Sequence, residues 1–185
     1  MDAPAQQIAL ADSAGSGAPV VWLHAGGKTP AAASQLAQHF RVLMFTIADT
    51  TSIIEDSAIA NAIGPHATES VGLIADATRA RASLRFAATR PDLVRAVALI
   101  APAVPERMPD EFKTPVMALF GTRDVPAHIG RSIREVISGC HVMFVYDTDR
   151  DMANQRPEAV AAILREFLQA GDRFLVTSKS GKLYP

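Results

Sequence analysis

The sequence is poor in cysteine, in net charge and in long hydrophobic runs. Its one cysteine, Cys140, excludes an intramolecular disulfide. With 18 basic and 19 acidic residues and a formal net charge of −1, the chain offers no basic field for nucleic acid. No apolar stretch reaches the roughly 18 residues of a membrane-spanning helix, and the first residues, MDAPAQQIALADSAGSG, lack the pattern of an export signal. We therefore expect a cytoplasmic protein that binds neither nucleic acid nor membranes.

What the sequence does contain is an alternation of short apolar runs with helical patterns. Hydrophobic residues make up 49% of the 185, enough for one sizeable core and a single domain over residues 1–185. Near-continuous apolar strands are typical of a parallel sheet buried on both faces. The pattern predicts a three-layer, doubly wound, mostly parallel α/β sheet. The predicted strands span residues 19–24, 41–47, 70–75, 93–101, 115–121 and 141–146, and the predicted helices span 29–40, 52–63, 78–90, 126–137 and 157–170.

The two ends and one connection complete this prediction. Residues 1–18 are predicted to form an edge strand and a turn, and residues 171–185 a C-terminal extension. Between the strands that end near Ala101 and begin near Pro115, the segment APAVPERMPDEFKT is too short for a cap domain. Any cleft is therefore expected to be open and shallow. Thr29 is predicted to cap the helix that follows Pro30.

Four segments, in the same order along the chain, resemble an α/β-hydrolase. VVWLHAGG (20–27) is similar to the strand and His-Gly loop that form one side of an oxyanion hole. RFAATRPDLVRAVALIAPAV (85–104) is similar to the helix after the nucleophile and the next strand. PVMALFGTRD (115–124) and VYDTDRDMANQRPEAVAAILREFL (145–168) are similar to the segments that carry the acid and the histidine of the triad. The resemblance implies that a ligand would contact His24, Ala25, Gly26, Thr78 and Arg150.

The position of the nucleophile carries alanine. In the family the nucleophile lies about fourteen residues before the proline that ends the next helix, and this count from Pro91 gives Ala77. The family's turn G-x-S-x-G appears here as Ala75-Asp76-Ala77-Thr78-Arg79. Both glycines and the serine are absent, so we expect a wider or reshaped turn and no serine hydrolysis.

The base of the triad is also replaced. Asp124 stands at the acid position, but Arg150 stands where the family has histidine. A guanidinium stays protonated and offers no acceptor, so Arg150 cannot act as a general base. We expect Asp124 and Arg150 to form an ion pair, and if that pair is buried, Arg150→Ala would cost about 3 to 5 kcal/mol of stability.

Three hypotheses follow for function. The first is a non-hydrolytic module that uses the cleft to bind a small molecule or a protein partner. The second is an active hydrolase of a small ester, amide or halide, with Asp76 as nucleophile or with Asp76 and Asp124 orienting a water. The third is a structural partner subunit, for which a large exposed apolar patch and a homodimer would be the signs.

Other polar residues are assigned structural roles. His24 is expected to shape the oxyanion loop and Cys140 to pack as a small side chain. Arg79 is a candidate partner of Asp76, and the series Arg79, Arg81 and Arg85 is predicted to form a solvated helix face. No cofactor is expected. No metal is expected either, because the acidic loop DTDRDMANQ lacks the glycine and the distal glutamate of a calcium loop.

Overall fold

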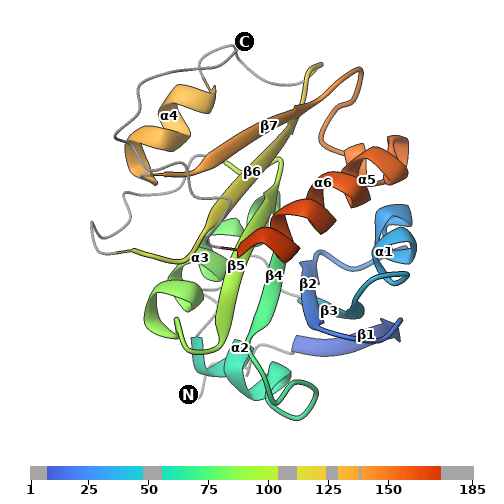
Figure 1. Ribbon diagram of the computed structural model, residues 1–185, viewed down its shortest axis with the longest axis vertical. Helices are drawn as coiled ribbons and strands as arrows, with labels where there is room; N and C mark the ends of the chain where they lie inside the picture. Colours follow the sequence, from blue (N-terminus) through green and yellow to red (C-terminus); the bar gives the residue numbers. More distant parts are fainter. Residues whose placement is uncertain (1–7, 48–55, 104–111, 124–128, 138, 172–185) are drawn as a thin grey trace, which may run out of the picture.

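The computed structural model describes residues 8–47, 56–103, 112–123, 129–137 and 139–171. These residues form a seven-stranded sheet in the order β1-β3-β2-β4-β5-β6-β7 (Figure 1). β1 is antiparallel to β3, and all other neighbouring strands are parallel. The strands are β1 (Ile8–Ala14), β2 (Pro19–His24), β3 (Arg41–Ile47), β4 (Val71–Asp76), β5 (Val94–Ile100), β6 (Val116–Gly121) and β7 (His141–Val145).

Helices cover both faces of this sheet. One hydrophobic cluster joins the sheet to α1, α5 and α6, and a second joins it to α2, α3 and α4. The protein is therefore a three-layer, doubly wound α/β domain, as the sequence predicted. The helices are α1 (Ala31–Leu36), α2 (Asp56–Ile63), α3 (Ala80–Thr89), α4 (Ile129–Val136), α5 (Met152–Gln155) and α6 (Pro157–Ala170), with a 3-10 turn, η1 (Ala77–Arg79), before α3.

The inner strands show why their sequences are almost continuously apolar. Successive side chains of a strand point to opposite faces of the sheet. In β4, Leu73 and Ala75 lie in the cluster with α3, whereas Ile74 lies in the cluster with α6. Both faces are thus buried, and each face needs an apolar residue at every second position.

The start of α1 corrects one prediction. Thr29 does not cap this helix: its N-cap is Pro30, and no side chain bonds at that position as a local cap. Instead the backbone N–H of Ala31 donates to Oδ1 of Asn154, at 2.9 Å. The acceptor therefore comes from α5, more than a hundred residues away, and no local capping pattern could have indicated it.

Some predicted features fall partly outside the described residues. The segment judged too short for a cap domain includes residues 104–111, and the C-terminal extension includes residues 172–185, all outside the described part. Within the described residues, no helix is both long enough and apolar enough to cross a membrane.

Candidate functional site

The topology places one crevice at the carboxyl ends of β2 and β4. These strands are neighbours, but α1, which follows β2, packs on one face of the sheet and α3, which follows β4, packs on the other. Such a switch point leaves a crevice outside the strand ends. A cleft of about 320 Å³ lies there. It brings together the predicted site residues His24, Gly26, Asp76, Ala77 and Arg150.

Ala77 stands at the point where strand passes into helix. It directly follows β4 and opens η1, and α3 begins three residues later at Ala80. Among the described residues other than glycine, only Ala101 and Asp147 have a positive φ, so the backbone of Ala77 is not left-handed. This turn differs from the sharp, strained elbow that exposes a nucleophile. Thr78 belongs to the same turn, and its side chain lies outside the described part.

The carboxylate of Asp76 is held by a donor from β2. Nε1 of Trp22 donates to Oδ1 of Asp76 at 3.0 Å. The backbone of Ala25, in the loop after β2, acts to lower the pKa of this carboxylate. Trp22 reaches it because Trp22 pairs with Ile74, which shares a sheet face with Asp76. Burial raises the pKa of Asp76, while Trp22 and the charges of His24 and Arg79 work in the opposite direction.

His24 is buried beside this carboxylate. Its Nδ1 accepts a hydrogen bond from the backbone N–H of Gly26 at 3.3 Å. Burial lowers the pKa of His24, so the ring is neutral near pH 7 and carries its proton on Nε2. Nε2 is buried and has no hydrogen-bond partner among the described residues. With Nδ1 engaged and Nε2 protonated, His24 has no free acceptor for general-base catalysis.

The prediction that Arg79 belongs to a solvated helix face is wrong, because Arg79 is only 3% exposed. Nη2 of Arg79 donates to the carbonyl oxygen of Ile47, the last residue of β3, at 3.1 Å. Burial lowers its pKa, and the charge of Asp76 opposes that effect. The helical count failed because Arg79 belongs to η1 and not to α3. Arg85, which does lie on α3, is partly exposed and pairs with Asp56 at 2.9 Å.

Loops form the other side of the cleft. Arg150 lines the cleft and is exposed. Asp124 lies outside the described residues, so its pairing with Arg150 stays a prediction. The large stability loss expected for Arg150→Ala depended on a buried pair, and Arg150 is exposed, so that condition is not met. Asp151 accepts a hydrogen bond from Nδ2 of Asn154 at 2.7 Å. The sequence analysis missed Asp151, Asn154 and Lys28 as lining residues, because no motif marks them.

Special backbone conformations also gather at the cleft. Gly26 and Gly27 have φ of 94° and 88°, which glycine adopts without steric cost. Ala101, after β5, lines the cleft with φ of 48°, a conformation that costs a residue with a Cβ about 1 kcal/mol or more. Its N–H donates to the carbonyl oxygen of Leu119 at 2.8 Å. The sheet therefore holds this strained residue in place.

Cys140 and the acidic loop show no sign of chemistry. Burial raises the pKa of the Cys140 thiol to about 12, so it stays protonated and packs as a small apolar side chain. Asp147 and Asp149 lie 3.7 and 3.9 Å from the guanidinium nitrogens of Arg123. Within the described residues, no group of three histidine, cysteine or acidic side chains is placed to hold a metal ion.

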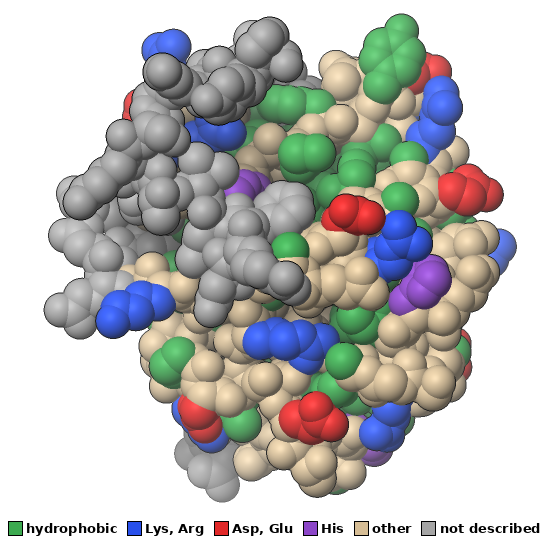
Figure 2. Space-filling model, in the orientation of Figure 1, with side chains coloured by type: hydrophobic (Ala, Val, Ile, Leu, Met, Phe, Trp, Pro, Cys, Tyr) green, Lys and Arg blue, Asp and Glu red, His purple; other side chains and the backbone are tan. Residues whose placement is uncertain are grey.

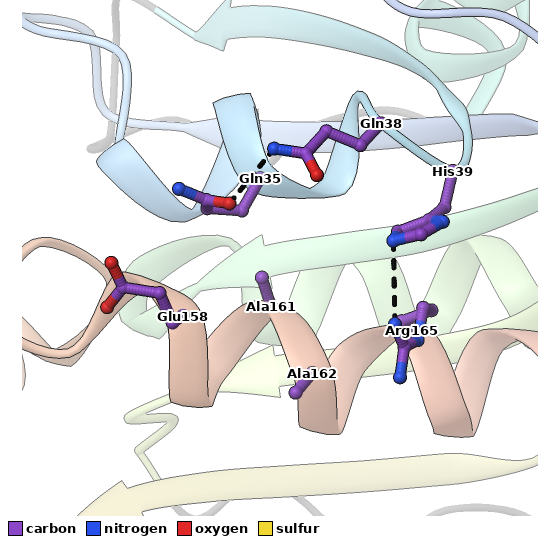
Figure 3. A pocket seen from close by; sticks show the side chains of 7 residues that line it. All are labelled: Gln35, Gln38, His39, Glu158, Ala161, Ala162 and Arg165. Atoms are coloured by element: carbon purple, nitrogen blue, oxygen red, sulfur yellow. Dashed lines mark hydrogen bonds between the residues drawn. The ribbon is translucent and has the colours of Figure 1, made fainter.

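A second, smaller groove lies between α1 and α6 (Figure 3). Its volume is about 170 Å³, and Ala161 lies in its floor with Glu158 and Arg165 on the same helix. Nη1 of Arg165 lies 3.4 Å from Nε2 of His39. The groove contains none of the predicted site residues and is away from the strand ends, so the larger cleft is the candidate site.

Comparison with solved structures agrees with the topology. A marine microorganism esterase superposes with a TM-score of 0.72 at 14% identity, covering 88% of this chain and all of that one. A putative epoxide hydrolase from Pseudomonas aeruginosa superposes with a TM-score of 0.69 at 13% identity, covering 93% of this chain and 98% of that one. The chain has the α/β-hydrolase fold. An α/β hydrolase enzyme from a lagoon-sediment metagenome superposes with a TM-score of 0.68 at 13% sequence identity. The match covers 86% of this chain and 94% of that one. No family model and no curated protein sequence matches the chain. At these identities the likeness establishes the fold alone.

Proposed function

We propose that this α/β-hydrolase-fold protein binds a small molecule in the cleft at the ends of β2 and β4 and does not hydrolyse it by the serine route. The observation that carries the proposal is that Ala77, the residue counted to the nucleophile position, lines this cleft with a methyl group. A methyl group cannot attack a carbonyl carbon. The cleft, about 320 Å³, is at the lower end of the range for ligand pockets and suits a small ligand.

The hydrogen bonds at the bottom of the cleft support the same proposal. The loop after β2 would supply oxyanion donors in a hydrolase. Here the N–H of Gly26 donates to Nδ1 of His24. A donor already engaged inside the protein is not directed at a developing negative charge, so this group does not favour acyl transfer.

A second candidate is hydrolysis of a small ester, amide or halide with Asp76 as nucleophile. It is favoured by the position of Asp76 in the cleft beside the buried His24. The bond from Trp22 weighs against it, because a carboxylate oxygen that already accepts a hydrogen bond is a weaker nucleophile. The absence of an available base on His24 weighs against it as well.

The first test is turnover of p-nitrophenyl butyrate by the native protein, by Asp76→Asn and by the double variant Ala77→Ser with Arg150→His. We expect no turnover above buffer in the native protein or in Asp76→Asn. Native turnover that Asp76→Asn abolishes would establish the second candidate and refute the first. Turnover confined to the double variant would show that the cleft still accepts an ester once the missing groups are returned.

Binding is tested with butyrate, methyl butyrate and butyramide by isothermal titration calorimetry. Ala77→Leu fills the cleft and is expected to abolish binding of whichever probe the native protein binds. Ala162→Leu, the same change at an exposed alanine in the groove between α1 and α6, is the matched control and should leave binding unchanged. Equal binding by both variants would place the ligand elsewhere.

The proposal includes a cytoplasmic location, supported by the single, buried cysteine.

A further inference from the structure

The floor of the cleft contains a buried hydrogen-bond donor that the protein itself does not use. His24 is only 3% exposed and lines the cleft. Because its Nδ1 accepts from the N–H of Gly26, its proton lies on Nε2, and Nε2 has no hydrogen-bond partner among the described residues. Buried polar groups in native proteins are almost always hydrogen-bonded. A donor left without a partner in the wall of a cleft indicates that a ligand supplies the acceptor.

An acceptor stands beside this donor. Trp22 pairs with Ile74 across β2 and β4. Two residues further along these strands, His24 and Asp76 therefore lie side by side and point to the same face of the sheet. Adjacent strands lie about 4.8 Å apart, so one small group can contact both side chains.

The carboxylate of Asp76 has acceptor capacity left for a ligand. A carboxylate offers about four acceptor sites, and Nε1 of Trp22 occupies one of them, at Oδ1. Asp76 also lines the cleft and is only partly buried. A ligand on the floor therefore meets the N–H of His24 and the carboxylate of Asp76 next to each other.

The charges around the cleft do not favour a ligand of either sign. Its lining includes two cations, Lys28 and Arg150, and two acids, Asp76 and Asp151. On the face shown in Figure 2, acidic and basic side chains are likewise interspersed and form no patch of one sign. A ligand carboxylate could accept from His24, but the ionised form of Asp76 beside it would repel the charge. The floor therefore selects its ligand by hydrogen bonding and not by charge.

We propose that the ligand of this cleft is a small neutral amide whose carbonyl and N–H lie on one edge, as in a lactam or a primary carboxamide. The carbonyl oxygen accepts from Nε2 of His24, and the N–H donates to the carboxylate of Asp76. An ester has acceptors alone, and an amine has no carbonyl, so neither satisfies both groups. Ala77 and Ile100, in the same lining, contact the apolar carbons of the ligand. This inference rests on the proposed binding function.

Two probes of similar size separate an amide site from a cleft that binds small molecules in general. Pyrrolidin-2-one carries the amide edge in a five-membered ring, and cyclopentanone has a five-membered ring with the carbonyl alone. The chain has one tryptophan, so the indole N–H of Trp22, which bonds to Asp76, gives a single side-chain signal in nitrogen-15 NMR. Titration of that signal follows binding at the floor. We expect the native protein to bind pyrrolidin-2-one at least about tenfold more tightly, because the ketone cannot donate to Asp76.

Two variants assign the two contacts. In Asp76→Asn the amide oxygen accepts from Trp22 and its NH2 group opposes the N–H of the lactam, so the preference for the lactam should fall below about threefold. Asp12→Asn, the same change on the exposed β1 edge, is the matched control and should keep the preference. His24→Phe removes the donor and should weaken both probes alike, because both carry the carbonyl. Circular dichroism checks that each variant is folded.

The outcomes distinguish the amide ligand from the binding function. Equal binding of the two probes, abolished for both by Ala77→Leu, would overturn the amide ligand and leave the cleft as a binding site. Binding of butyrate or methyl butyrate without binding of the lactam would do the same. A preference for the lactam that survives Asp76→Asn would also overturn the proposed contact. If none of these probes bound, the binding function would fail together with the amide ligand.

Discussion

The floor and the rim of the cleft are held in place by different means. The floor, His24 and Asp76 with Trp22 beneath them, stands on β2 and β4. Trp22 donates to Asp76, and Nδ1 of His24 accepts from Gly26 in the adjacent loop. The rim, Lys28 and Arg150 with their neighbours, stands on loops and is exposed. Trp22 is fully buried, whereas Arg150 is exposed.

This difference indicates which part determines the fold and which part meets a ligand. Side chains on buried strands are fixed by packing, and their removal is costly. Side chains on exposed loops are replaced at little cost in stability, so they are free to vary with the ligand. The floor should therefore respond to mutation mainly through stability, and the rim mainly through binding.

The largest effect is expected from Trp22→Ala. The change removes a fully buried indole, opens a cavity and takes away the donor to Asp76, so the free energy of unfolding should fall by about 3 to 5 kcal/mol. Urea denaturation followed by circular dichroism measures it. Tyr146→Ala, at an exposed aromatic, is the control and should change stability by less than about 0.5 kcal/mol. Equal losses would mean that the burial of Trp22 adds nothing to the stability of the floor.

Gly121→Ala is expected to disturb the support of the rim. A Cβ at Gly121 would overlap the carbonyl oxygens of Thr148 and Asp149, which precede Arg150. Backbone atoms cannot move aside as a side chain can, so stability should fall by about 1 to 3 kcal/mol. Gly130→Ala is the matched control, because its nearest neighbour is the Val142 side chain at 3.3 Å and alanine favours the helix by up to about 1 kcal/mol. A neutral Gly121→Ala would show that the loop after β7 is not closely packed on β6.

Asp76→Asn, in the floor of the cleft, is expected to change how the stability of the protein depends on pH. Burial raises the pKa of Asp76 in the folded protein above its value of about 3.9 in the unfolded chain. Between those two pH values the folded state binds more protons than the unfolded state. The contribution of Asp76 to stability is therefore complete below the unfolded-state pKa and is lost as pH rises through the folded-state pKa. Asparagine keeps an acceptor for Trp22 and does not titrate. The stability of Asp76→Asn relative to the native protein should therefore increase as pH rises from about 4 through the folded-state pKa of Asp76.

Urea denaturation of both proteins across that range measures the difference. Asp12→Asn, the same change at an exposed position on the β1 edge, is the matched control. Parallel stability curves for the native protein and Asp76→Asn would mean that the carboxylate is solvated in the folded state.

The fold could be predicted from local pattern because each inner strand carries its own evidence. β2 and β3 have the predicted bounds, since a strand buried on both faces must be apolar throughout and the flanking residues are not. The helix starts were less certain, as at α1, where the bond that replaces a cap comes from Asn154. That contact depends on how α5 lies against α1, and neither segment shows it alone.

The candidate site was predicted where a motif specified a position along the chain. The residues His24, Asp76, Ala77 and Arg150 do line one cleft. What these residues bond to could not be predicted in the same way. The link from Trp22 to Asp76 follows from the pairing of β2 with β4, and the burial of Arg79 follows from the 3-10 turn that takes it out of the register of α3. Strand order and turn type are properties of the whole fold.

The smallest effect on stability is expected from Arg150→Ala. Arg150 is exposed, and an exposed ion pair contributes about 0 to 1 kcal/mol, so the loss should stay below about 1 kcal/mol in urea denaturation. Because Arg150 lines the cleft, the same variant should weaken binding of butyrate more than binding of the uncharged butyramide. Arg165→Ala, in the groove between α1 and α6, is the control for both measurements. A stability loss of about 3 to 5 kcal/mol would mean that Arg150 neutralises a buried carboxylate, for which Asp124 is the candidate, and Arg150 would then belong with the floor.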